Sequence, residues 1–166
     1  SIVLASRSAL VQSDGDVVDG NGNSAIWLDT SPGLYYVSVR HRNHLGAMLL
    51  YPRPLTPFMT YVDFSENTLP TWGTDARNTT GPVALLWSGD VNFDGSLRYT
   101  GTGNDRDPIL VEIGGTTPNA VVNKYHGTDV NMDAAIKYTG TANDRDRILV
   151  NIGGTTPNAV RTEQIP

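Results

Sequence analysis

Hydrophobic and polar residues alternate along the first part of the chain. The alternation, with β-branched or aromatic residues at the apolar positions, is clearest in residues 2–11, 25–28, 34–40 and 59–64. A period of two residues is typical of strands with one buried face, and the Gly, Asn and Asp residues of 14–23 predict a long turn. We therefore expect a mostly β protein, in which residues 1–64 form an antiparallel β-sandwich of the Ig or transthyretin-like kind.

The first expected strand begins at Ile2, with nothing ahead of it in the sequence. A sandwich of four or five short strands leaves at least one exposed edge, which proteins normally protect. Three explanations stay open: the domain is complete and small, a preceding strand has been lost, or another chain supplies that strand.

The second half of the chain contains an internal repeat. Residues 99–121 and 138–160 are offset by 39 positions and differ at only three of 23 positions. Two copies are too few for a solenoid, which needs about three, so we expect a pair of like units packed on each other. The expected organisation is a sandwich over 1–64, a polar connector over 65–82, and a tandem repeat over 83–166, with copies at about 83–121 and 122–160.

Each repeat opens with an acidic loop, DVNFDGSL from Asp90 and DVNMDAAI from Asp129. A calcium ion takes six to eight oxygen ligands, which a tight turn supplies from side chains at positions 1, 3 and 5 and from the carbonyl at position 7. Position 8 is apolar and is expected to enter a core between the loops. The spacing predicts about two bound Ca²⁺ ions.

The acid that closes each loop is less regular. Position 12 holds Gly101 or Gly140, so the closing acid must come later in the sequence. The next segment predicts a short helix, with Asp107 as N-cap, Pro108 in the first turn and a glycine C-cap. The candidate ligands are Asp90, Asn92, Asp94, Ser96, Asp105 and Asp107 in the first loop, and Asp129, Asn131, Asp133, Ala135, Asp144 and Asp146 in the second.

Two observations bear on these loops. If Asp107 and Asp146 cap the helices, Asp105 and Asp144 are the better ligand candidates. Ala134 stands where glycine usually supplies a left-handed backbone, which weakens the prediction for the second loop. The alternative for both loops is a set of Asx turns on a solvated surface.

Composition narrows the function classes. The net charge of −5 and only two lysines argue against a nucleic-acid or anionic-lipid surface, and the absence of cysteine excludes disulfides and thiolate zinc sites. The acids comprise 14 Asp and 3 Glu, which favours turn-borne oxygen ligands over helices. Two divalent ions would bring the formal charge from −5 to about −1.

At these motifs the chain resembles two known groups of proteins. The tandem DVNxDG-type loop, followed directly by a helix, resembles the duplicated calcium module of type I dockerins, from which the inserted YTGTxNDRD departs. RSALVQSDGDVVD, SPGLYYVSVRHRNHLGAM and the repeats ending in RTEQIP are similar to the C-terminal region of large secreted surface proteins of Bacteroidota. Members usually carry another strand before the equivalent of residues 1–4. The resemblance implies an extracellular, cell-surface location rather than a reaction.

Other candidate features are weaker. Asp14–Asn23 offers a further acidic turn, for which a hydrated hairpin is the simpler reading. His41 and His44 fall on opposite faces of an expected strand, which disfavours a shared metal and favours structural hydrogen bonding or contact with a neighbouring subunit. The three tryptophans are suited either to core packing or to a sugar-stacking platform. No hydrolase elbow, zinc-protease or phosphate-loop motif and no carboxylate dyad is present, so an enzyme is not expected.

The sequence therefore predicts a non-catalytic, extracellular structural or adhesive module stabilised by calcium. Self-association into a cell-surface fibre or layer, by addition of a strand from a neighbouring copy, is the expected role. The alternative is a recognition module that binds carbohydrate or a cohesin-like protein partner. No membrane insertion is expected.

Overall fold

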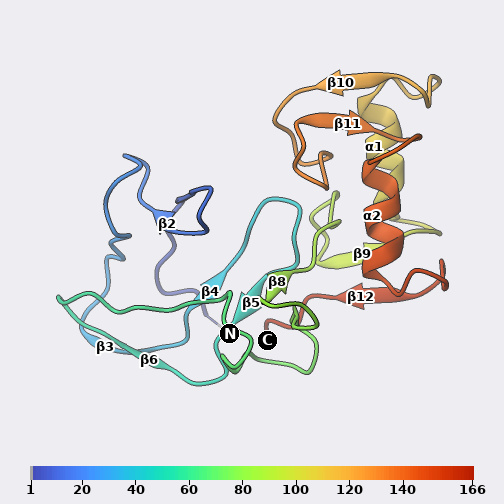
Figure 1. Ribbon diagram of the computed structural model, residues 1–166. Helices are drawn as coiled ribbons and strands as arrows, with labels where there is room; N and C mark the ends of the chain where they lie inside the picture. The colour runs from blue at the N-terminus through green and yellow to red at the C-terminus, as the bar shows by residue number, and fades with distance from the viewer. Residues whose placement is uncertain (1) are drawn as a thin grey trace. The chain divides into compact units, whose positions relative to one another are not determined.

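The computed structural model describes residues 2–166, which form short antiparallel strand pairs and two short helices (Figure 1). The expectation of a mostly β protein is confirmed. The strands pair two by two, however, and the described residues do not form a single closed sandwich. Two compact units are present: a first unit of residues 2–36, 52–62 and Pro166, and a second unit of residues 37–51 and 63–165.

The first unit contains two strand pairs. Strand β1 (Leu10–Val11) pairs with β2 (Val17–Val18), and β3 (Gly33–Tyr35) pairs with β6 (Arg53–Leu55). These strands are shorter than the alternation predicted, and residues 25–28 and 59–64 contain none. Alternation stabilises a strand only where its apolar face is covered, and in this unit no second layer covers it.

The first unit has no buried residue among 2–36 and 52–62. Twelve of its large apolar side chains are exposed, from 41% for Val17 to 85% for Ile2, and the others are only partly buried. The twelve are Ile2, Val3, Leu4, Leu10, Val11, Val17, Trp27, Leu34, Tyr36, Phe58, Met59 and Tyr61. Since burial of apolar area is the main favourable term in folding, this unit lacks the usual source of stability within its own residues.

The second unit begins with a hairpin of β4 (Ser38–Val39) and β5 (Ala47–Met48), and a further pair of β7 (Arg77–Asn78) and β8 (Leu85–Leu86) follows. Arg77 is buried and donates hydrogen bonds to the carbonyls of Phe64, Glu66 and Leu69. One guanidinium therefore orders much of the segment expected to be a connector. The expected domain limits at residues 64 and 82 stay a prediction.

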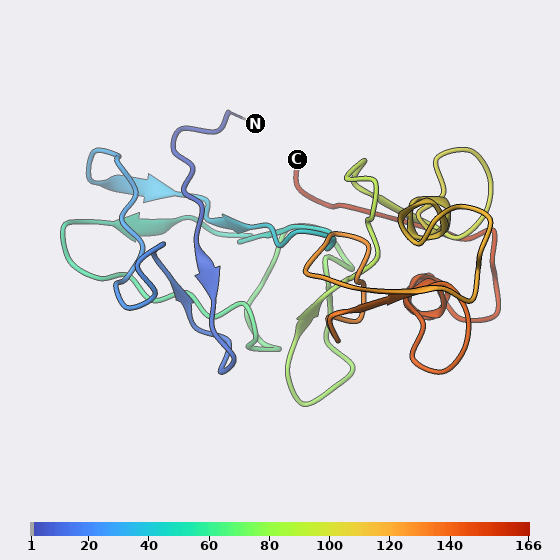
Figure 2. The same cartoon turned by 90° about the horizontal axis from the view of Figure 1, so that it is seen from above.

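The strands of each repeat pair with strands of the other repeat. The first contributes β9 (Ser96–Arg98), α1 (Arg106–Glu112) and β10 (Val121–Asn123), and the second contributes β11 (Ala135–Lys137), α2 (Asp144–Asn151) and β12 (Val160–Thr162). Strand β9 pairs with β12, and β10 pairs with β11, so each pair joins one strand from each repeat. The helices lie side by side, as Figure 2 shows nearly end-on.

Equivalent hydrogen bonds join the two repeats at both strand pairs. The Thr100 hydroxyl donates to the carbonyl of Pro157 at 3.1 Å, and the Thr139 hydroxyl donates to the carbonyl of Pro118 at 3.0 Å. Leu97 and Ile136, at position 8 of the two loops, are both fully buried. Ile136 enters the core between the repeats as expected, whereas Leu97 packs in a second cluster with Leu45 and Ile152. The core between the repeats consists of Val91, Ile109, Ile113, Val130, Ile136 and Ile148.

Both helices end as predicted but begin differently. Gly115 N–H donates to the Leu110 carbonyl at 2.8 Å, and Gly114 N–H donates to the Val111 carbonyl at 3.0 Å, which is a Schellman motif. At the start of α2, Asn143 accepts from the backbone N–H of Asp146 at 2.9 Å. At the start of α1, Asn104 Oδ1 likewise accepts from the backbone N–H of Asp107 at 3.1 Å. The prediction of Asp107 as N-cap is therefore wrong, because the asparagine three residues earlier accepts this bond. Neither helix has the length and apolar character needed to cross a bilayer.

Candidate metal centres

The first loop (residues 90–105) is folded by hydrogen bonds to its own acidic side chains. Asp90 accepts from the backbone N–H groups of Asp94 at 3.0 Å and Gly95 at 3.1 Å. Asn92 Oδ1 accepts from Asp94 N–H at 2.9 Å, and Asp94 Oδ1 accepts from Ser96 N–H at 2.9 Å. These successive Asx turns hold positions 1, 3 and 5 around one short bend.

The second loop (residues 129–144) repeats this network. Asp129 accepts from the backbone N–H groups of Asp133 and Ala134, each at 3.1 Å, and Asp133 Oδ1 accepts from Ala135 N–H at 2.9 Å. Ala134 has a φ of 64°, against 76° for Gly95 at the same loop position. The expected left-handed backbone at Ala134 is thus confirmed, and alanine adopts it despite its Cβ.

Asp105 and Asp144 join the ends of each loop. Asp105 is fully buried; its Oδ1 accepts from Val91 N–H at 2.8 Å and its Oδ2 accepts from Arg98 N–H at 2.7 Å. Asp144, also fully buried, accepts from the N–H groups of Val130 at 2.6 Å and Lys137 at 2.8 Å. Each carboxylate therefore connects the start of its loop to the strand that follows.

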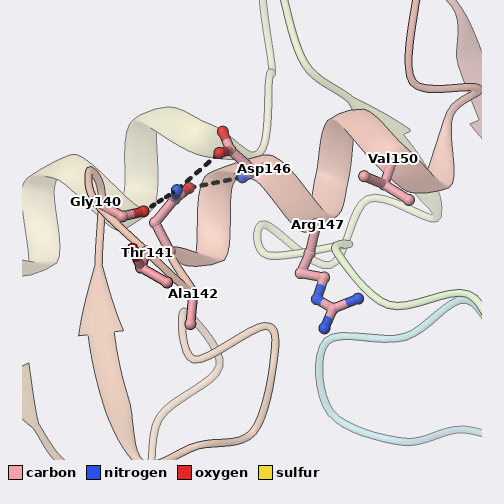
Figure 3. Close-up of a pocket in the computed structure, with 7 residues that line it drawn as sticks. Gly140, Thr141, Ala142, Asp146, Arg147 and Val150 are labelled. Atoms are coloured by element: carbon pink, nitrogen blue, oxygen red, sulfur yellow. Dashed lines mark hydrogen bonds between the residues drawn. The ribbon is translucent and has the colours of Figure 1, made fainter.

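Asp107 and Asp146 lie at the starts of the helices instead. They bond to helix-start residues: Asp107 Oδ2 accepts from Asn104 Nδ2, and Asp146 Oδ2 accepts from Asn143 Nδ2, both at 2.8 Å. Asn143 and Asp146 line a hollow of about 290 Å³, and Figure 3 shows Asp146 with its hydrogen bonds at this hollow. Residues of the inserted segment and of α2 line this hollow.

Burial raises the pKa of several loop carboxyl groups. The pKa of Asp105 rises to about 7, chiefly because burial removes water from the charged form, with the nearby charge of Asp90 adding to the effect. Burial also raises the pKa of Asp90 and of Asp144, the latter with a contribution from Asp129. A bound cation would offset both the lost solvation and the mutual repulsion of these carboxylates.

In each loop a basic side chain forms an ion pair with the aspartate at position 5. Arg98 Nη1 lies 2.8 Å from Asp94 Oδ2, and Lys137 Nζ lies 3.7 Å from Asp133 Oδ2. These pairs occupy the outer, half-exposed side of the position-5 carboxylates. They reduce the negative charge of the ion-free loops.

The available donors are oxygen atoms, which suit a hard cation such as Ca²⁺. Within residues 2–166 no group of three or more His, Cys, Asp or Glu side chains is arranged as a ready metal cage. Loops of this type complete their ligand set with an amide oxygen and a backbone carbonyl, which such a grouping does not include. The twelve candidate ligands stay a prediction, and the geometry associates Asp105 and Asp144, rather than Asp107 and Asp146, with the loops.

The other sequence candidates take separate places. His41 and His44 meet, with their Nδ1 atoms 3.1 Å apart, because residues 42 and 43 form a turn rather than a strand. The expectation of opposite faces was wrong, and that of a structural hydrogen bond is confirmed. In the Asp14–Asn23 turn, Asp19 Oδ2 forms an ion pair with Arg7 Nη2 at 2.7 Å, which lowers the pKa of Asp19.

Trp27 and Trp87 differ in their exposure to solvent. Trp27 is 64% exposed, so core packing does not explain it. Trp87 packs beside a core cluster, under the guanidinium of Arg161 at 3.6 Å.

The burial of two residues in the second unit was not predicted from the sequence. Asn43 is fully buried, and Arg42 has a side chain only 14% exposed. The run Arg-His-Arg-Asn-His in residues 40–44 was the only sequence signal, because charged and amide residues are rarely buried unless they have partners.

Comparisons with models of protein families, with curated proteins and with solved structures found no match to this chain. Support for a function therefore comes from the chemistry of these loops and surfaces.

Proposed function

We propose that this chain is a non-catalytic, calcium-stabilised structural or adhesive module of an extracellular assembly, in which copies associate through the first unit. In this proposal the twin loops of the second unit bind about two Ca²⁺ ions, as in a dockerin-like module. The first unit is then part of a β-sandwich that a strand from a neighbouring copy completes. Cell-surface location, as the resemblance to Bacteroidota surface proteins implies, belongs to the same proposal.

The observation that carries the proposal is the absence of any buried residue in 2–36 and 52–62, despite twelve exposed large apolar side chains. Large apolar side chains exposed in this number are typical of surfaces that a partner covers. Strands β3 and β6 form an isolated pair, and β3 has no second strand partner among the described residues. On β6, Pro54 has no N–H and its carbonyl accepts from the Thr60 hydroxyl at 2.7 Å, so β3 offers the better edge. Addition of an extended apolar segment, such as residues 2–4 of another copy, along β3 would pair its backbone groups and cover the side chains.

The calcium part is supported by the twin Asx-turn networks and by the buried carboxylates of Asp105 and Asp144. Burial of a carboxylate is costly unless an opposite charge or hydrogen bonds compensate it. Here backbone N–H groups compensate in part, and a divalent cation would supply the remainder. In a chain without disulfides, such ions serve as the crosslinks that hold turns and strands together.

Assembly is tested by light scattering and negative-stain microscopy of the purified chain in calcium. We expect polymers in the unaltered chain, and a shift to monomers in Leu4→Asp, because a charge cannot enter an apolar interface. The matched control is Val111→Asp, on α1, since both side chains are 72% exposed. Monomers in the unaltered chain at all concentrations, or equal polymers in both variants, would refute assembly through the first unit.

The closing ligand is tested by calorimetric calcium titration of two variants. Asp105→Asn is expected to weaken the first site by at least tenfold, since a metal site loses a charged ligand. Asp107→Asn, which alters a carboxylate at the helix start, is the control and is expected to keep the affinity. The opposite order of effects would show that Asp107 closes the loop.

A second candidate function, carbohydrate recognition, is favoured by the exposed ring of Trp27 in the first unit. Exposed aromatic rings stack on the apolar faces of sugars. Retardation of the unaltered chain, but not of Trp27→Ala, in a polysaccharide gel would support this candidate. Such a result together with monomeric protein would count against assembly.

A further inference from the structure

The turn between β4 and β5 lies against both loops. The backbone oxygen of Asn43 accepts from the N–H groups of Gly89 at 2.7 Å and Asp90 at 3.1 Å. Its side-chain amide donates to the carbonyls of Gly127 at 2.7 Å and Asp129 at 2.8 Å. A single buried residue thus holds the first ligand position of each loop.

The neighbouring Arg42 forms an ion pair with the second loop but not with the first. Its Nη2 lies 3.7 Å from Asp129 Oδ2, and its guanidinium stacks over the ring of Tyr125 at 3.9 Å. Among residues 2–166, no Lys, Arg or His makes the equivalent ion pair with Asp90. The repeats are nearly identical in sequence, but a positive charge from outside them faces only the second loop.

Arg42 also has unused hydrogen-bonding capacity. Its Nε and Nη1 atoms are buried and have no hydrogen-bond partner among the described residues. A buried guanidinium with unpaired donors is costly, so its attraction to Asp129 is the main compensation available in this structure. The Arg42 guanidinium therefore has few partners other than Asp129 and the Tyr125 ring.

We infer that Arg42 is a built-in competitor of calcium at the second loop and makes the two loops unequal in affinity. This inference rests on the proposed function. In the ion-free chain Arg42 neutralises Asp129; when a cation binds the same carboxylate, two like charges face each other. Occupancy of the second loop then weakens the Arg42–Asp129 pair, whereas occupancy of the first loop, whose Asp90 has no such partner among the described residues, does not.

The expected size of the effect follows from charge separation. With the screening of bulk water, two unit charges 3.7 Å apart correspond to roughly a tenfold change in binding, which is the lower limit for this largely buried pair. The unaltered chain should therefore show a tight first step and a second step weaker by about that factor or more.

The experiment is calorimetric titration with CaCl₂ of chelator-treated, full-length chain. Asp90→Asn disables the first loop, and in that background Arg42→Gln should raise the affinity of the second loop about tenfold or more, while Arg42→Lys, which keeps the charge, should not. In the matched Asp129→Asn background, Arg42→Gln should leave the first loop unchanged. Circular dichroism checks that each variant is folded.

A second measurement needs no change at Arg42. Asp129→Asn should remove the weaker step of the unaltered chain, and Asp90→Asn the tighter one. The reverse order, or equal affinities in the Gln and Lys variants, would overturn the inference while leaving calcium binding intact. Absence of any calcium binding to the unaltered chain would overturn the proposed function and this inference together.

Discussion

The left-handed residue at position 6 of each loop allows a reciprocal test, since nature has placed glycine in one copy and alanine in the other. Gly95 has a φ of 76° and Ala134 a φ of 64°. We predict that Ala134→Gly stabilises the second unit and that Gly95→Ala destabilises it. The double variant, which exchanges the two residues, should have nearly the original stability.

The magnitude follows from the backbone. A residue with a Cβ loses roughly 1–2 kcal/mol in the left-handed region, whereas glycine loses about 0.5–1 kcal/mol more chain entropy on folding. The net gain for Ala134→Gly is therefore about 1 kcal/mol. A Cβ added at Gly95 would meet only Glu163 Cβ, at 3.7 Å, so the reverse change adds no clash to the conformational cost.

The assay is thermal and urea unfolding, with and without calcium. We expect shifts in Tm of about 4 °C, upward for Ala134→Gly and downward for Gly95→Ala. Ala135→Gly is the control, because Ala135 is not left-handed and glycine should there be destabilising. The reasoning fails if Ala134→Gly lowers the stability as much as Ala135→Gly does.

Three further predictions follow from the loops, a histidine pair and a helix cap. Chelation with EDTA should lower Tm and raise the protease sensitivity of residues after about 83, and folded protein that is indifferent to EDTA would contradict calcium binding. Burial, with smaller contributions from His41 and Arg42, lowers the pKa of His44 to about 4. Its folded pKa is below its unfolded value, so stability should fall by up to about 3 kcal/mol as pH drops from 6.5 to 4, and His44→Gln should reduce that slope in acid-unfolding curves. Asn143→Ala removes the acceptor of the Asp146 N–H and should cost about 1–2 kcal/mol in urea unfolding, whereas Thr141→Ala, which does not cap α2, should cost less.

Local features of the repeats could be predicted from sequence because neighbouring residues determine them. Gly114 and Gly115 end a helix where a left-handed backbone is needed, and Leu97 and Ile136 are apolar at loop position 8, where the side chain is buried. The N-caps were misassigned because Asn104 and Asp107 both suit a helix start, and only the backbone shows which of them accepts the capping bond.

The first unit shows the opposite case. Alternation in residues 2–11 predicted a strand, but only Leu10 and Val11 form one. A strand depends on its partners for backbone hydrogen bonds and on a second layer for burial, and neither is encoded in the alternation itself.

The sequence alone therefore determined the duplication, the acidic loops, the left-handed position at Ala134 and the glycine ends of the helices, since these depend on residues a few positions apart. Tertiary structure decided that each repeat pairs its strands with the other, that Asn43 joins both loops, and that Arg42 faces only Asp129. The β10–β11 pair joins residues 12 to 16 positions apart, and the other contacts join residues 46 to 87 positions apart along the chain. The near-identity of the repeats could not reveal their difference in charge environment, because that difference comes from a hairpin outside them.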